Sequence, residues 1–371
     1  MGPRRSLHPR PYGIPTVAPR YSRPAEWSCD NPARMRLDDR FDELIDTLTG
    51  FHRTWIVYLG VELGLFRHLR SAGREGLTTA ELASACTCAP GPIEAWAMAA
   101  DAHGLAELRD GRLVLDDDTA VILLDEDRPE FLGGQFVHSV IASLDWSHML
   151  GFFRTGEPIR HRPDRYRESI ERLTVQDVAV FFQEALAELP QVVGELAAGG
   201  RVVDIHCGGG RWLIAMAQRF PSLELIGIEF EPDSVARARS NVDAAGLGSR
   251  IEILQGDVTS LASAGRFDLA YFQYALHQLG DPVGALRTAF AALEPGGRIL
   301  VLDWALPSNL EEFRTSQGEL IAGVQLDELY QGTALATREQ FASWFAEAGL
   351  PVDAIDLPSG ASLFVAGRAA E

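Results

Sequence analysis

A run of glycines joins a strand-like apolar segment to a helix-like one in the stretch VVDIHCGGGRW, residues 202–212. Glycines at such a junction let backbone N–H groups approach a polar ligand closely, at the N-terminus of the following helix. A dinucleotide fingerprint needs a third small residue, and counting from Gly208 that position falls on Leu213. The turn therefore predicts a nucleotide-like ligand and disfavours NAD or FAD.

An acidic residue stands where such a ligand would need one. Glu229 ends the next apolar segment, nineteen residues after Gly210, and a carboxylate there can accept hydrogen bonds from both hydroxyls of a ribose. The alternative is a carboxylate that merely caps a strand end in an acidic protein. We favour the ribose role, because the position fits it.

Composition excludes several kinds of chemistry. All 33 basic residues are arginine, which removes the lysine of P-loop enzymes and of Schiff-base enzymes. The net charge of −19 disfavours nucleic acid as a partner, and no apolar run is long enough to span a membrane. Four cysteines form neither a disulfide framework nor a four-ligand zinc pattern, so we expect no metal and a cytoplasmic location.

The N-terminal part contains two kinds of sequence. Residues 1–36 carry seven arginines and seven prolines without apolar periodicity, which predicts a disordered basic extension, although Met35 could be the natural start. Residues 37–125 show helical periodicity, followed by a hairpin at Asp110–Gly111. Helix, turn, helix and hairpin is the order of a winged helix. Its second helix lacks arginine, so we expect dimerisation rather than DNA binding.

The remaining residues supply a bridge and a sheet. Residues 126–197 predict a helical bridge with breaks near Gly156 and Pro163. Over residues 198–371, apolar segments alternate with helical ones, which predicts an α/β fold with a parallel sheet between helices. A turn at Pro358–Gly360 predicts a C-terminal antiparallel hairpin.

Several ordered motifs in residues 200–303 resemble those of class I S-adenosylmethionine (SAM)-dependent methyltransferases, which have a Rossmann-like sheet. VVDIHCGGG resembles the first motif, IGIEFEPDSVARAR the second and ILQGDVTSL the third, while FDLAYFQYALHQL and LEPGGRILVLDW resemble the fourth strand and the Pro-Gly-Gly turn before the fifth. The segment from GLTTAELA to the hairpin, with RTGEP after it, is similar to two-domain small-molecule O-methyltransferases, which dimerise through a winged-helix domain.

The resemblance implies SAM as cofactor, S-adenosylhomocysteine (SAH) as product, and a set of cofactor-binding residues. Asp204 would order the glycine turn, Glu229 would bind the ribose, and Asp257 would bind the adenine amino group. The others would line the methionine part or pack on the adenine: Cys207, Gly208, Gly210, Phe230, Val258 and Gln273. His206 departs from the motif because it occupies the first glycine position. It is either a tolerated structural change or a group that reaches the ligand.

Two residues are candidates for catalysis. His277 in YALHQL aligns with the histidine base of the O-methyltransferase subgroup, but His-Gln-Leu replaces the usual His-Asp-Trp. Asp303 matches the acid near that active site and could orient an imidazole, or be only a strand-end carboxylate. The changed pattern leaves carbon or nitrogen open as the methyl acceptor beside the usual oxygen.

Aromatic residues in the bridge and beside the turn are candidates for a substrate pocket, or for packing between domains. They are Phe136, His138, Trp146, His148, Phe181, Phe182 and Tyr274, with Trp212 and Tyr271 as weaker candidates. Together they favour an apolar or aromatic small molecule. The sequence thus predicts a dimeric methyltransferase of specialised metabolism. Two alternatives are an enzyme that cyclises or rearranges its substrate without methyl transfer, and a non-catalytic SAM-sensing regulator.

Overall fold

The computed structural model describes residues 36–367, so the predicted extension at residues 1–36 lies almost wholly outside the described residues. The chain divides into two units, residues 1–49 and 50–371. In the first unit, the described residues belong to the N-terminal part of helix α1 (Leu37–Glu62). Arg40 and Glu43 form an ion pair one helical turn apart on this helix, with a nitrogen–oxygen distance of 2.7 Å.

A small helical module begins the second unit. Its hydrophobic core is built around Leu65, Phe66, Trp96 and Leu113. Thr78 forms a reciprocal capping box with Glu81 at the start of one helix, and Asp110 and Gly111 both take positive φ in the predicted hairpin turn. Its elements are α2 (Leu65–Ala72), η1 (Gly73–Glu75), α3 (Thr79–Ala85), α4 (Pro90–Ala102), β1 (Glu107–Arg109), β2 (Arg112–Val114) and α5 (Asp117–Leu124).

The bridge is helical, and its helices are interrupted at the glycine and the proline where the sequence predicted breaks. Gly156 takes a left-handed conformation after one helix, and Pro163 precedes the next. A π-helical turn, a form that is frequent at functional sites, lies near the end of the bridge. Its elements are α6 (Gly133–Ser143), η2 (Trp146–His148), α7 (Met149–Thr155), α8 (Asp164–Leu173), α9 (Val175–Val180) and the π-turn η3 (Phe181–Ala185).

A seven-stranded sheet forms the rest of the unit, in the order β5-β4-β3-β6-β7-β9-β8. The first five strands in this order are parallel, and β9 runs antiparallel to both β7 and β8. The predicted α/β fold with a C-terminal hairpin is confirmed. The strands are β3 (Gly200–Ile205), β4 (Leu223–Glu229), β5 (Ile251–Gln255), β6 (Phe267–Gln273), β7 (Leu293–Asp303), β8 (Asp353–Asp356) and β9 (Ser362–Gly367).

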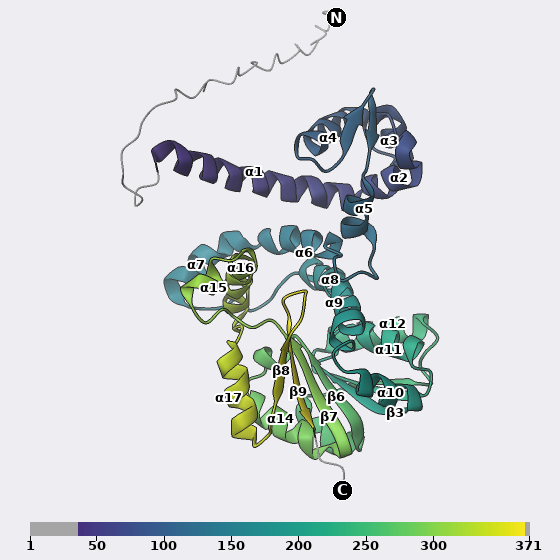
Figure 1. Ribbon diagram of the computed structural model, residues 1–371, viewed down its shortest axis with the longest axis vertical. Helices are drawn as coiled ribbons and strands as arrows, with labels where there is room; N and C mark the ends of the chain where they lie inside the picture. The colour runs from purple at the N-terminus through teal and green to yellow at the C-terminus, as the bar shows by residue number, and fades with distance from the viewer. Residues whose placement is uncertain (1–35, 368–371) are drawn as a thin grey trace, which may run out of the picture. The chain divides into compact units, whose positions relative to one another are not determined.

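Helices cover both faces of this sheet (Figure 1). One face packs under η3, α10 (Pro190–Ala198), α11 (Arg211–Arg219) and α12 (Pro232–Ala244). The other packs under α13 (Leu261–Ala264), α14 (Pro282–Ala291) and α17 (Arg338–Ala348). The remaining elements are η4 (Val258–Ser260), η5 (Leu276–Gln278), α15 (Leu310–Phe313) and α16 (Ser316–Gln331).

The Pro-Gly-Gly segment differs from the prediction. We expected a turn before the fifth strand, but β7 already begins at Leu293 and runs through the two glycines. The pairing with β6 shifts register between Phe267 and Leu269. An irregularity of this kind lets a strand bend without ending.

Candidate functional site

The glycine turn lies at the carboxyl edge of the sheet, between the end of β3 and the start of α11. His206, Gly208 and Gly210 all have positive φ, at 67°, 53° and 73°. If Gly208 carried a Cβ atom, no other atom would lie within 4 Å of it, so there is open space beside the turn. Left-handed backbone at a non-glycine residue costs about 1–3 kcal/mol, so His206 stores strain at the position where the motif expects glycine.

Glu229 fixes the shape of this turn. Its buried carboxylate accepts hydrogen bonds from the backbone N–H groups of Gly208 at 3.0 Å, Phe230 at 2.9 Å and Glu231 at 3.0 Å. We expected Asp204 to order the loop, but the carboxylate that holds the glycine turn is that of Glu229. The residue proposed for the ribose is therefore locked at the edge of β4, within reach of the turn.

Asp204 has a different environment. It is buried, and its Oδ1 has no hydrogen-bond partner among the described residues. Burial, and then the charge of Glu229, raise the pKa of Asp204 to about 8. A buried polar atom without a partner carries a free-energy cost. Asp204 stands one residue before the carboxyl end of β3, so this unpartnered atom lies close to the glycine turn.

His206 contacts the loop after β4. Its ring is stacked on Phe230, with centroids 5.3 Å apart and planes 9° apart, and Nε2 lies 3.8 Å from Oε1 of Glu229. Phe230 is itself half exposed. The imidazole thus covers one face of the ring that the resemblance assigned to the adenine.

Replacing His206 with glycine is expected not to destabilise the protein. The change relieves about 1–3 kcal/mol of backbone strain. Glycine loses more conformational entropy on folding, and the stacking on Phe230 is lost, but these two costs offset only part of the gain. The opposite change, Gly208→Ala, introduces left-handed backbone where a Cβ meets open space, and should cost about 1–2 kcal/mol. Thermal unfolding of both variants tests this. A His206→Gly protein that unfolds below Gly208→Ala would contradict the strain at residue 206.

The other predicted cofactor residues take mixed positions. The side chain of Cys207 belongs to the core and faces Gly227 of β4, so it is not part of an open surface. Asp257 is exposed and caps η4, and the hydrogen bonds from the hydroxyl and then the N–H of Thr259 hold the pKa of its carboxyl below the ordinary value. Val258 is half-buried against the core of the opposite sheet face.

Gln273 ends β6, and its amide donates to Oδ2 of Asp177 on α9 at 3.3 Å. Asp177 could not be found from the sequence, because a lone acid in a short helix belongs to no motif. Burial raises the pKa of this carboxyl to about 7.

His277 and Asp303 form a buried pair. Nδ1 of His277 lies 2.8 Å from Oδ2 of Asp303, which is fully buried at the end of β7. The structure brings together two residues that were predicted separately as catalytic. Nε2 of His277 is buried and has no hydrogen bond to any described residue, so Asp303 holds one ring nitrogen and the other has no such partner.

A third carboxylate, missed in the sequence, completes this cluster. Oε2 of Glu328 on α16 lies 3.8 Å from Nε2 of His277. Burial lowers the pKa of His277, but the charges of Asp303 and Glu328 outweigh burial and raise it to about 10. The histidine is therefore protonated at neutral pH.

A cavity of about 630 Å³ lies beside His277. Phe152, Leu329 and Trp344 contribute apolar walls, and Thr333 and Gln340 contribute polar groups. A volume of this size suits a small organic molecule. None of the seven predicted substrate residues is among those that line it.

Those seven residues lie in several environments. Phe136 packs on the core of the N-terminal module, and Phe181 is fully buried beside Trp212 and Tyr271. Phe182 contacts Phe181, Tyr274 contacts Trp304, and His148 is exposed. For Phe136 and Phe181 the packing alternative fits the structure better.

His138 and Trp146 contact a polar network centred on the buried carboxylate of Asp327. Trp146 Nε1 donates to Asp327 at 3.1 Å, and the Tyr166 hydroxyl donates to it at 3.0 Å. Arg162 pairs with the same carboxylate. His138 contacts Ser169 at 3.0 Å, and burial lowers its pKa to about 4, so it is neutral at pH 7. The network joins the bridge to α16, the helix that carries Glu328.

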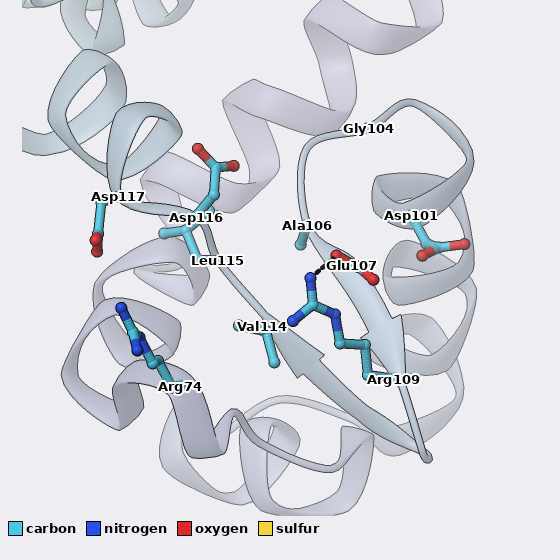
Figure 2. Close-up of a pocket in the computed structure, with 10 residues that line it drawn as sticks. All are labelled: Arg74, Asp101, Gly104, Ala106, Glu107, Arg109, Val114, Leu115, Asp116 and Asp117. Atoms are coloured by element: carbon cyan, nitrogen blue, oxygen red, sulfur yellow. Dashed lines mark hydrogen bonds and ion pairs between the residues drawn. The ribbon is translucent and has the colours of Figure 1, made fainter.

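A second pocket, of about 580 Å³, lies in the helical module between the hairpin and the start of α5 (Figure 2). Asp101 accepts from the N–H of Leu108, Asp116 caps α5, and Glu107 pairs with Arg109. These charged groups already have partners, so we do not place the functional site here.

The described residues hold no group of three or more His, Cys, Asp or Glu side chains arranged to bind a metal ion. In the same part of the chain, no helix has both the length and the apolar character needed to cross a membrane.

The glycine turn and the acid that ends β4 lie in a part of the chain that resembles known proteins. Residues 196–349 match the protein family described as "Methyltransferase domain". A demethylmenaquinone methyltransferase of Thermus thermophilus is 31% identical over 108 residues, which cover 29% of this chain and 48% of that protein. The chain thus spans about half the length of that relative.

Two further proteins resemble most of the chain. A 3-hydroxy-5-methyl-1-naphthoate 3-O-methyltransferase of Streptomyces sahachiroi is 24% identical over 316 residues, 82% of this chain and 88% of that protein. The solved structure of mitomycin 7-O-methyltransferase MmcR aligns with a TM-score of 0.64 at 23% identity, covering 90% of this chain and 98% of that one. The second likeness shows that the two chains share a fold.

Proposed function

We propose that this protein transfers a methyl group from SAM to a small aromatic or apolar metabolite, with oxygen favoured as acceptor and carbon or nitrogen open. The observation that carries the proposal is a shared sheet edge. The glycine turn follows β3, Glu229 ends β4 and Asp303, paired with His277, ends β7. The carboxyl ends of parallel strands meet at one edge, where open α/β sheets bind their ligands.

The residues at this edge divide the work. Bound SAM supplies an electrophilic methyl group on a sulfonium. The turn and Glu229 hold the nucleoside, because the carboxylate accepts hydroxyl hydrogen bonds and the turn leaves open space. Asp303 orients His277 so that Nε2 of the neutral imidazole can take the proton of an acceptor hydroxyl. Positioning acceptor against methyl supplies much of the remaining rate.

The named relatives support the substrate class. The Streptomyces sahachiroi protein acts, by its name, on a hydroxylated naphthoate. The apolar walls of the cavity beside His277 suit a ring of that kind. To test the proposal, the full chain is incubated with SAM and a panel of hydroxylated naphthoates and phenols, and products are weighed by mass spectrometry. A product heavier by one CH₂ supports it, whereas an isomeric product would establish rearrangement instead.

The charge on His277 predicts a pH dependence. A base with a pKa of about 10 is mostly protonated at pH 7, so the rate of methyl transfer should rise from pH 7 towards about pH 10. Replacing Glu328 with glutamine removes one charge that raises the pKa of His277, and should move the rise to lower pH. Initial rates of the wild type and Glu328→Gln between pH 6 and 10 test this, and coincident profiles would contradict it.

The same shift affects stability. Because the folded-state pKa of His277 lies above its ordinary value of 6.5, its contribution to stability is fully present below that pH. The contribution is lost as pH rises towards about 10.

We propose a homodimer formed through an N-terminal winged-helix module in a cytoplasmic protein. The first unit leaves one apolar helix face exposed, comprising Leu37, Phe41, Leu44, Ile45 and Leu48, each at least 43% accessible. These positions recur at helical spacing, and a contiguous apolar patch marks an interaction site. Leu48→Asp is expected to convert a dimer into a monomer at micromolar concentration in sedimentation, with Asp46→Asn as control. A wild-type monomer would contradict it.

A further inference from the structure

Asp177 is a buried carboxylate without a cation. It lies on α9 and is 8% exposed, and no arginine or histidine of the described chain forms an ion pair with it. Its hydrogen bond comes from the amide of Gln273, at 3.3 Å. Burial of a charge without a counterion is unfavourable, and the raised pKa of this carboxyl, about 7, reflects that cost. A cationic ligand bound beside Asp177 would therefore offset the free-energy cost of burying its charge.

Its surroundings contain further polar atoms without partners. Oε1 of Gln273, the hydroxyl of Tyr271 and Oδ1 of Asp204 are all buried and lack a hydrogen bond among residues 36–367. Tyr271 and Gln273 are two positions apart on β6 and so point to the same face. Asp204 is the register partner of Tyr271 on β3. These groups therefore share one face of the sheet near its carboxyl edge.

The register also places this group beside the glycine turn. Ile205 pairs with Phe272 across β3 and β6, so Gln273 lies at the level of His206, where the turn begins. Tyr271 stacks on Trp212 of α11, with ring centroids 4.3 Å apart, and Phe181 lies 5.0 Å from Tyr271. This aromatic cluster packs against the same face of the sheet, next to the helix that follows the glycine turn.

A carboxylate next to an amide oxygen offers two acceptors of the kind that bind an ammonium group. Resting on the proposed function, we propose that Asp177 and Gln273 bind the α-ammonium group of the methionine part of SAM and SAH. Glu229 and Asp177 then hold opposite ends of one ligand. Glu229 recognises the ribose and Asp177 recognises the amino acid.

The test compares two ligands that differ in the amino acid. SAH carries the ammonium group, whereas 5′-methylthioadenosine has the nucleoside and thioether alone. Calorimetric titration of the full chain is done at pH 8, where Asp177 is mostly ionised. The Asp177→Asn variant is expected to bind SAH about tenfold more weakly than the wild type. The affinity for 5′-methylthioadenosine should change less than about twofold. Asp164→Asn, an exposed acid of the neighbouring helix α8, should leave both unchanged.

Stability separates this role from a structural one. A structural carboxylate stabilises the free protein, but an unpaired buried charge destabilises it. Ligand-free Asp177→Asn should therefore unfold at the same or a higher temperature than the wild type at pH 8. A lower unfolding temperature, with both ligands weakened equally, would show a structural role and overturn the assignment.

The remaining outcomes are also decisive. If SAH and 5′-methylthioadenosine bind the wild type and Asp177→Asn alike, the assignment fails while the proposed function stands. If such a variant instead raises the KM of a basic acceptor, the carboxylate serves the substrate, and the assignment to SAM is wrong. If the wild type binds neither nucleoside, the proposed function fails and the assignment falls with it.

Discussion

Replacing Glu229 with alanine is expected to weaken SAH binding about 100-fold, because two charge-assisted hydrogen bonds to a ribose contribute about 3 kcal/mol. The same change removes the acceptor of three backbone N–H groups. The free energy of unfolding should therefore fall by about 2–4 kcal/mol. Calorimetry and denaturant unfolding measure the two effects.

A second variant separates binding from folding. Glu229→Gln keeps the size of the side chain but replaces one acceptor oxygen with a donor, so it should lose SAH affinity with a smaller loss of stability. Glu224→Gln changes an exposed acid on the same strand and should leave SAH binding unchanged. If Glu229→Ala bound SAH with the affinity of the wild type, the proposal that Glu229 binds the ribose would be wrong.

Replacing His277 with asparagine is expected to lower kcat for methyl transfer at least about 100-fold, since a positioned general base contributes about 10²–10⁴. The affinity for SAH should change less than about twofold, because the proposed role of His277 is to take a proton from the methyl acceptor and not to bind the nucleoside. The alkaline rise in rate should also disappear. Rates are measured on an acceptor that the wild type methylates.

The matched control for this variant is His52→Asn, an exposed histidine on α1. It should leave kcat and the pH profile unchanged. A His277→Asn enzyme with the wild-type kcat would exclude this histidine as the base, and would favour carbon methylation or catalysis by positioning alone.

The fold was largely predictable because its signals are local. Alternating apolar and helical segments predict the parallel sheet, Thr78 and Thr337 cap helices that the structure contains, and Asp110–Gly111 forms its turn. The prediction for the Pro-Gly-Gly segment was wrong because β6 pairs with Leu293 before it and with Arg298 after it, so the strand continues past an irregular register. Such pairing depends on a distant strand.

The candidate site was predictable only where a motif marks it. Glu229 and Asp303 end strands and His277 lies in the turn after another strand, and the parallel sheet brings such positions to one edge. Glu328 and Asp177 come from helices outside the motifs, and reach the site through tertiary packing. The sequence cannot distinguish whether an aromatic residue of the bridge, such as Phe181, packs in the core or lines a pocket. In the structure Phe181 lies in the core.

The most direct test of the account is calorimetric titration of the purified full chain with SAH, with NADH as the comparison ligand. Micromolar binding of SAH and no binding of NADH are expected, since the turn lies beside Glu229, the residue proposed for the ribose, but lacks the dinucleotide fingerprint. Binding of NADH with no binding of SAH would contradict it. If neither binds, His206→Gly is the decisive variant. Recovery of SAH binding would show that this histidine closes the turn, and continued failure would contradict the methyltransferase proposal.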